Sequence, residues 1–222
     1  MEIAIEKARK AGTGWVSTRN SNHYGIAGYY AMMALEQDMI GISTTNAAVL
    51  VVPTFGRDAM YGTNPIAFAA PADEERGFVL DMATTVAAAG KIRTLAQRGE
   101  PMPEGWMVGR DGKPLTDPAR REEGFLLPIG GAKGYGLAMA LGLLAGTLNG
   151  AAFGKDVVDM TRDTATPTNT GQFIAAISVA AFADVAAFKA AVPGVGVYLV
   201  SPDRIASIAA WKRPIPFSSI RC

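Results

Sequence analysis

Apolar positions recur with a helical spacing in several stretches of this chain. Within residues 27–38, apolar side chains stand three or four positions apart, which is the spacing of one helix face. The charged segment 2–11 also predicts a helix, and Gly12 ends it. Further helices are expected at residues 84–97, where Thr84 or Thr85 could be the N-cap, at 133–148 and at 185–190.

Short runs rich in β-branched residues predict strands between these helices. They cover residues 15–18, 40–44, 66–70, 77–80, 126–129, 173–179 and 195–200. Residues 98–123 are rich in Gly, Pro and charge, and we expect a long surface excursion there. The fold class predicted is α/β with a mixed sheet and some α+β character. The tail from Trp211 onward is not placed by any pattern.

Composition and charge exclude several classes of protein. The chain has 222 residues, of which 49% are hydrophobic and 18% charged, as in an ordinary globular protein. A net charge of +1 with no basic cluster gives no electrostatic footprint for nucleic acid. The single cysteine, Cys222, excludes an internal disulfide, and a reducing cytoplasm is the expected location.

One segment has the length of a membrane span. Residues 134–154 carry no charge, but six glycines dilute their apolar character. A buried helix with small residues for close packing is the favoured interpretation, and a membrane-associated protein is the weaker alternative. We therefore expect no membrane partner.

The chain has one histidine, His23, in the sequence Ser-Asn-His-Tyr-Gly at 21–25. Imidazole is the side chain best suited to proton transfer near neutral pH, so histidine-mediated proton transfer here would have to use His23. The alternative is a residue that only makes local hydrogen bonds near a helix start. Position alone leaves both open.

Several familiar catalytic and binding patterns are missing from the sequence. Three nitrogen or sulfur ligands for zinc are not available, and we expect no metal. No Gly-x-Ser-x-Gly elbow is present. Gly12-Thr13-Gly14 lacks the third glycine of a dinucleotide fingerprint and follows a helix instead of a strand.

Two segments could instead hold a ligand. Asp-Met-Ala-Thr-Thr at 81–85 connects a predicted strand to a predicted helix start, where amides and hydroxyls can bind an anion or a ribose; plain helix capping is the alternative. Lys133 lies among four glycines at 130–136, so it could contact a phosphate or carboxylate. A structural lysine is the other interpretation, but it does not explain so many glycines.

Five motifs in order carry a resemblance to a known family. They are Ser-Asn-His-Tyr-Gly at 21–25, Gly-Thr-Asn-Pro at 62–65, Asp-Met-Ala-Thr-Thr at 81–85, Thr-Asp-Pro at 116–118 and Gly-Gly-Ala-Lys-Gly-Tyr-Gly at 130–136. Together they resemble the malate/L-lactate/sulfolactate dehydrogenase-like oxidoreductases, which include the ureidoglycolate dehydrogenases. The likeness covers about residues 1–180, with a looser similarity near 194–205.

The resemblance implies hydride transfer between NAD or NADP and a small 2-oxo or 2-hydroxy acid. It also implies the non-Rossmann cofactor-binding fold of the L-sulfolactate dehydrogenase-like type, in a homodimer. His23 would be the acid/base and Lys133 a cofactor contact. The remaining residues that the resemblance assigns are cofactor-lining Asp81, Met82, Ala83, Thr84 and Gly134, and substrate-proximal Thr63 and Asn64.

The chain also departs from the family pattern. Relatives begin with a helical segment carrying a Ser-His pair, which has no counterpart before residue 1, so we expect residues 1–180 to form a cofactor domain without it. Residues 181–222 would be a shortened C-terminal portion. The alternative function is a catalytically silent relative that keeps only dinucleotide binding or an interaction surface. Arg57, Arg93 and Arg110 could each clamp a substrate carboxylate, and no spacing chooses among them.

Overall fold

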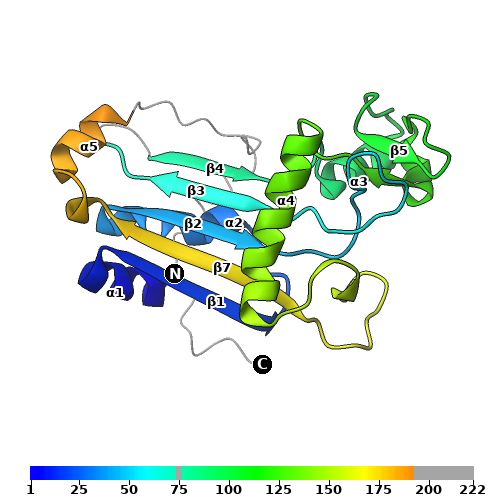
Figure 1. Ribbon diagram of the computed structural model, residues 1–222. Coiled ribbons are helices and arrows are strands. Elements are labelled where there is room, and N and C mark those ends of the chain that lie inside the picture. Colours follow the sequence, from blue (N-terminus) through cyan, green and yellow to red (C-terminus); the bar gives the residue numbers. More distant parts are fainter. Residues whose placement is uncertain (74–76, 193–222) are drawn as a thin grey trace.

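The fold is built on a five-stranded sheet, seen in the computed structural model (Figure 1), which describes residues 1–73 and 77–192. The strand order is β1-β7-β2-β3-β4. Every pairing between neighbouring strands of this sheet is antiparallel. The α/β class is confirmed, but the expectation of a mixed sheet is wrong for the described residues. The strands are β1 (Thr13–Ser21), β2 (Met39–Thr45), β3 (Ile66–Ala70), β4 (Phe78–Met82) and β7 (Thr170–Ser178).

Two helices pack on one face of the sheet. A Cβ on Gly14 would lie 1.9 Å from a carbonyl of α1 (Glu2–Ala11), and a Cβ on Gly41 would lie 2.0 Å from a carbonyl of α2 (Ala27–Met32). Both glycines stand opposite Ala176 of β7, so they share one face. Glycine at these positions lets the helix backbones approach the strands directly.

Helix α4 (Ala132–Ala145) covers the other face. A Cβ on Gly171 would lie 1.9 Å from the carbonyl of Ala145, and Gly171 is an odd number of positions from Ala176 along β7. Figure 1 shows α4 standing across the ends of the strands, with α2 behind the sheet. Strand β7 is central and almost entirely buried because helices lie on both of its faces. In the described ranges, none of the helices is long and apolar enough to cross a bilayer.

The expected helix over residues 27–38 is divided in two. After α2 the chain forms a short 3₁₀ turn, η1 (Leu35–Gln37), and Asp38 takes a left-handed φ of 51°. The amide of Met39 then donates to the carbonyl of Ala34, which closes the helix end as in a Schellman motif. Asp38 takes the left-handed position that glycine usually fills, and the helical segment ends there as predicted.

Residues 98–123 are largely exposed, as predicted for a surface excursion, but they contain structure of their own. They pair as β5 (Met107–Gly109) with β6 (Gly124–Leu126), joined through η2 (Pro118–Glu123) and packed beside α3 (Ala89–Arg98). Met102, Met107 and Leu115 are buried in one cluster with Ile92 of α3. This lobe lies on the far side of α4 from most of the sheet (Figure 1). These three apolar residues join a core cluster that also contains Val51, Tyr61 and Ala138, so the segment packs against the rest of the protein.

The remaining elements follow the sequence expectations closely. The short helices are α5 (Val185–Ala191), η3 (Thr147–Asn149), η4 (Gly154–Asp156) and η5 (Val179–Ala181). The predicted strand at 195–200 and the tail from Trp211 lie outside the described residues. The division into 1–180 and 181–222 therefore stays a prediction.

Candidate functional site

His23 lies on an exposed loop between the end of β1 and the start of α2. Its Nδ1 accepts a hydrogen bond from the amide of Gly25 at 3.0 Å. A nitrogen that accepts cannot carry the proton, so the neutral ring holds its proton on Nε2. The N-cap of α2 is Ile26, which makes no side-chain capping bond, so His23 does not cap that helix. The local hydrogen bond expected of a purely structural histidine is therefore present, but the ring remains exposed to solvent.

The side chain of Tyr24, the residue after His23, packs against the protein instead of facing solvent. The hydroxyl of Tyr24 is 3.0 Å from Oγ of Ser43 on β2, and its ring stacks on Tyr30 with centroids 4.8 Å apart. Tyr30 donates to the carbonyl of Tyr24 at 3.0 Å. Burial, supplemented by the negative charge of Asp81, raises the pKa of Tyr24, so this phenol remains protonated at neutral pH. Tyr24 thus anchors the exposed imidazole loop to the sheet.

Asp81 connects this loop to β4. Its Oδ2 accepts the backbone amide of Gly28 at 2.8 Å, in the first turn of α2. A Cβ on Gly28 would lie 2.9 Å from that oxygen, so the contact requires a small residue there. A carboxylate at a helix N-terminus satisfies an otherwise unpaired amide and the positive end of the helix dipole. Asp81, on β4, therefore caps the N-terminus of α2.

Thr84 lies in an extended segment that joins two other motifs. Its amide and its Oγ1 both donate to the carbonyl of Thr63, at 3.0 and 2.9 Å. Its own carbonyl accepts the amide of Ile129 at 2.9 Å. The prediction that Thr84 or Thr85 caps a helix is wrong, because α3 begins at Ala89 after the N-cap Ala88. Because no helix begins there, residues 81–85 offer no helix N-terminus for binding an anion.

Lys133 stands in the first turn of α4, directly after the Ile129 contact, and its side chain is exposed. Gly130 and Gly131 both have φ of 61°, which side-chain-bearing residues rarely adopt. A Cβ on Gly134 would lie 2.0 Å from the carbonyl of Ile129. Within residues 1–73 and 77–192, Lys133 forms no ion pair. A cation beside the positive end of a helix dipole favours an anion at this point.

Asn64 has a different environment from the residues above. It is buried with φ of 27°; its Oδ1 accepts the amide of Ala47 at 3.1 Å, and its Nδ2 donates to the carbonyl of Ala138 in α4 at 2.8 Å. The Asn64 side chain is thus bonded within the protein at both polar atoms. Its geometry is that of a link between the loop after β2 and α4.

The structure therefore joins four of the five motifs through a chain of contacts. Asp81 caps α2, the helix that follows the loop of His23, and the strand end leads to Thr84. Thr84 contacts both Thr63 and the segment before Lys133. Met82 and Ala83, between Asp81 and Thr84, are half-buried. Sequence reasoning missed Tyr24 and Ser43 as supports of this site, since a tyrosine beside a histidine and a serine within a strand carry no signal alone.

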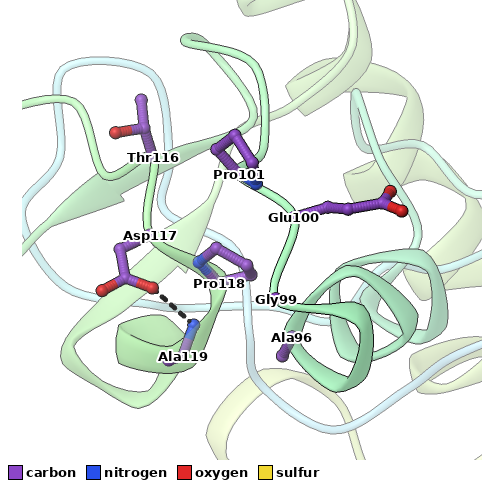
Figure 2. A pocket seen from close by; sticks show the side chains of 8 residues that line it. All are labelled: Ala96, Gly99, Glu100, Pro101, Thr116, Asp117, Pro118 and Ala119. Atoms are coloured by element: carbon purple, nitrogen blue, oxygen red, sulfur yellow. Dashed lines mark hydrogen bonds between the residues drawn. The ribbon is translucent and has the colours of Figure 1, made fainter.

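The fifth motif belongs to a separate pocket (Figure 2). This pocket, of about 260 Å³, lies between the end of α3 and η2, and Gly99, Glu100 and Thr116 help to line it. Asp117 also lines it, but its Oδ1 accepts the amide of Ala119 at 2.9 Å and so caps η2. The Thr-Asp-Pro motif thus has a structural explanation.

The structure does not single out one of the three arginines that could bind a substrate carboxylate. Arg57 and Arg93 are exposed, and the guanidinium of Arg110 lies 5.0 Å from the centre of the Phe125 ring in the lobe. Nothing in these positions favours one arginine over the others as the partner of the carboxylate.

Fold and site together define an α/β protein with an antiparallel sheet and no Rossmann fingerprint. The family model described as malate/L-lactate dehydrogenase matches residues 1–203. The malate dehydrogenase of Pyrococcus abyssi is 45% identical over 198 residues, covering 85% of this chain and 53% of that protein. The L-sulfolactate dehydrogenase of Methanocaldococcus jannaschii is 50% identical over 157 residues, covering 71% and 45%.

Solved structures agree with these relatives. The malate dehydrogenase from Entamoeba histolytica has a TM-score of 0.81 at 34% identity and covers 85% of this chain and 56% of that one. The sulfolactate dehydrogenase from M. jannaschii has a TM-score of 0.77 at 45% identity, covering 85% and 54%. This chain belongs to the malate/L-lactate dehydrogenase family. It spans about half the length of the curated relatives it matches.

Proposed function

We propose that this protein is an NAD(P)-dependent oxidoreductase that interconverts a small 2-oxo acid and the corresponding 2-hydroxy acid. The family match and the names of the relatives support the reaction class, since these are malate, L-sulfolactate and ureidoglycolate (NAD(+)) dehydrogenases. The observation that supports the proposal for this chain is the exposed ring of His23, which the amide of Gly25 holds and which lies just before the helix that Asp81 caps.

The residues present fit a dinucleotide. Lys133 offers a positive charge beside the N-terminus of α4, and Gly130 and Gly131 place no side chain on the backbone there. Met82 and Ala83 lie half-buried at the adjoining strand end. Thr84 and Asn64 are buried, and together with Thr63 they hold that segment in place. When bound, NAD or NADP would supply or accept the hydride.

His23 would handle the proton. In reduction, the substrate carbonyl oxygen becomes a hydroxyl and needs one proton, which the imidazolium can donate through Nε2. In oxidation, the neutral ring must accept the hydroxyl proton at Nε2. Its own proton then has to lie on Nδ1, which breaks the bond with the Gly25 amide. The imidazolium that donates in reduction also carries a proton on Nδ1. The bond from the Gly25 amide therefore belongs to the resting neutral ring, and it has to open for proton transfer in either direction.

The proposal is tested with His23→Ala in the full chain. We expect NADH or NADPH to show enhanced fluorescence on binding to both proteins, and 2-oxoacid-dependent loss of absorbance only in the wild type. The rate should fall by about two orders of magnitude or more, as for loss of a general acid. Lys133→Ala should instead weaken dinucleotide binding.

A second outcome would favour the silent relative. Binding of NADH or NADPH without turnover of malate, sulfolactate or other 2-oxo and 2-hydroxy acids by the wild type would contradict the enzyme proposal. Equal turnover by the wild type and His23→Ala would remove His23 from the mechanism.

A further inference from the structure

Three side chains at alternate positions bind Ser21 and Asn22, where β1 ends. Thr168, Thr170 and Gln172 stand two residues apart, so their side chains lie on one face of the extended chain. Thr170 Oγ1 donates to the carbonyl of Ser21 at 2.5 Å, and Gln172 Nε2 donates to the carbonyl of Asn22 at 3.2 Å. Thr168 Oγ1 donates to the side-chain oxygen of Asn22. This ladder of three residues holds the segment that leads into the imidazole loop.

Gln172 is itself fixed. Only 3% of it is exposed, and the hydroxyl of Thr18 donates to its Oε1 while accepting its backbone amide at 3.3 Å. Because Oε1 faces a donor, Nε2 must be the atom that faces the carbonyl of Asn22. A buried amide with both ends satisfied has one orientation, and its loss leaves unpaired polar groups.

A β-bulge explains why this segment needs side-chain support. Thr18 stands opposite Gln172 and Ser21 opposite Thr170, so β1 advances three residues while β7 advances two. Asn20, inside the bulge, has a left-handed φ of 52°. The extra residue interrupts the backbone ladder and bends the strand end. Beyond it, Ser21 and Asn22 are held by the ladder side chains.

We propose that Gln172 is the positioning residue of His23; this inference rests on the proposed function. The carbonyl of Asn22 and the amide of His23 belong to one planar peptide unit, so a bond that fixes the carbonyl also fixes the plane from which His23 projects. The Gly25 amide then fixes the ring through Nδ1. Gln172 lies on the same sheet face as Ser43, the partner of Tyr24, so both supports of the loop come from one side.

Gln172→Met tests the proposal because it keeps the length of the side chain and removes the donor. His23 is the only histidine, so a ¹H–¹³C spectrum of histidine-labelled protein reports on it alone. We expect its signal to shift and broaden, and kcat to fall by about one to two orders of magnitude, since small misplacements of a catalytic group cost this much. The KM for the dinucleotide should stay near the wild-type value, because Lys133 is untouched.

Gln97→Met, at an exposed position of α3, is the matched control and should leave the histidine signal and kcat unchanged. Thr18→Val removes the support of Gln172 but keeps Gln172 itself, and it should shift the histidine signal in the same direction. It decides the question if Gln172→Met fails to fold. A wild-type histidine signal in a folded Gln172 or Thr18 variant would overturn the positioning role. If His23→Ala keeps full turnover, the proposed function fails, while the histidine spectrum still decides whether Gln172 positions the ring.

Discussion

At the residue scale, the glycines around Lys133 act for different physical reasons. Gly130 and Gly131 are needed for their positive φ, whereas Gly134 is needed because the carbonyl of Ile129 occupies the place of a side chain. Gly136 meets neither condition, since a Cβ there would have nothing within 4 Å. The pattern that suggested a ligand site is thus in large part a requirement of the backbone. The exposed Lys133 is the residue that this requirement does not explain.

The two glycines of α4 give a matched pair of variants. Gly134→Ala places a Cβ against the Ile129 carbonyl and should cost about 2 kcal/mol in the free energy of unfolding, as overpacking does. Gly136→Ala should stabilise the helix by up to about 1 kcal/mol through its higher helix propensity. Urea unfolding measures both. A harmless Gly134→Ala would show that α4 and Ile129 are not packed as described.

At the element scale, the extended segment after β4 is the connection on which the site depends. Thr84 is fully buried and contacts the Thr63 carbonyl on one side and the Ile129 amide on the other. A strand-like link of this kind sets the distance between the sheet edge and α4. The Asp-Met-Ala-Thr-Thr motif is therefore a spacer between two parts of the site instead of a helix start.

Thr84→Val tests the link. The substitution keeps the shape and removes the hydroxyl that donates to Thr63, so the free energy of unfolding should fall by about 1 kcal/mol. Thr94→Val removes an exposed hydroxyl bond within α3 and should change stability by no more than about 0.5 kcal/mol. Equal effects in thermal or urea unfolding would argue against a special role for Thr84.

At the scale of the whole molecule, apolar surface remains on the outside. Leu143 of α4 is 48% exposed and Leu148 just beyond it 66%, and Ala140 lies on the same side of the helix. On the sheet face that α4 covers in part, Trp15 is 48% exposed. Large apolar side chains left exposed in this way are typical of an interface when they gather into a patch. Homodimer formation remains a proposal that this surface supports.

Sedimentation velocity tests the association. The average mass of the wild-type chain should rise with concentration, and Leu143→Lys should reduce that rise because it places a charge on the exposed apolar helix face. Thr166→Lys, in an exposed polar loop, is the control for the added charge. A wild-type chain that remains a monomer at every concentration would contradict this prediction.

The sequence by itself determined the class of fold, most helix and strand positions, and the family. The charged run 2–11 with its glycine stop, the apolar run 66–70 beside a polar turn, and the uncharged run that begins after Lys133 were sufficient to predict a helix, a strand and a buried helix. Ordered motifs were sufficient for the family because five together are specific where each alone is not.

Only the tertiary structure decided how these segments meet. No local sequence pattern indicates that Asp81 caps α2 or that Asn64 joins a loop to α4. Nor does any pattern indicate that Gln172 binds the carbonyl of Asn22, just before His23. Each of these bonds joins residues far apart in the chain, and local propensity carries no information about such pairings. The start of α3 was misplaced for the same reason: the hydroxyl of Thr84 could have capped a helix, and a distant carbonyl took it.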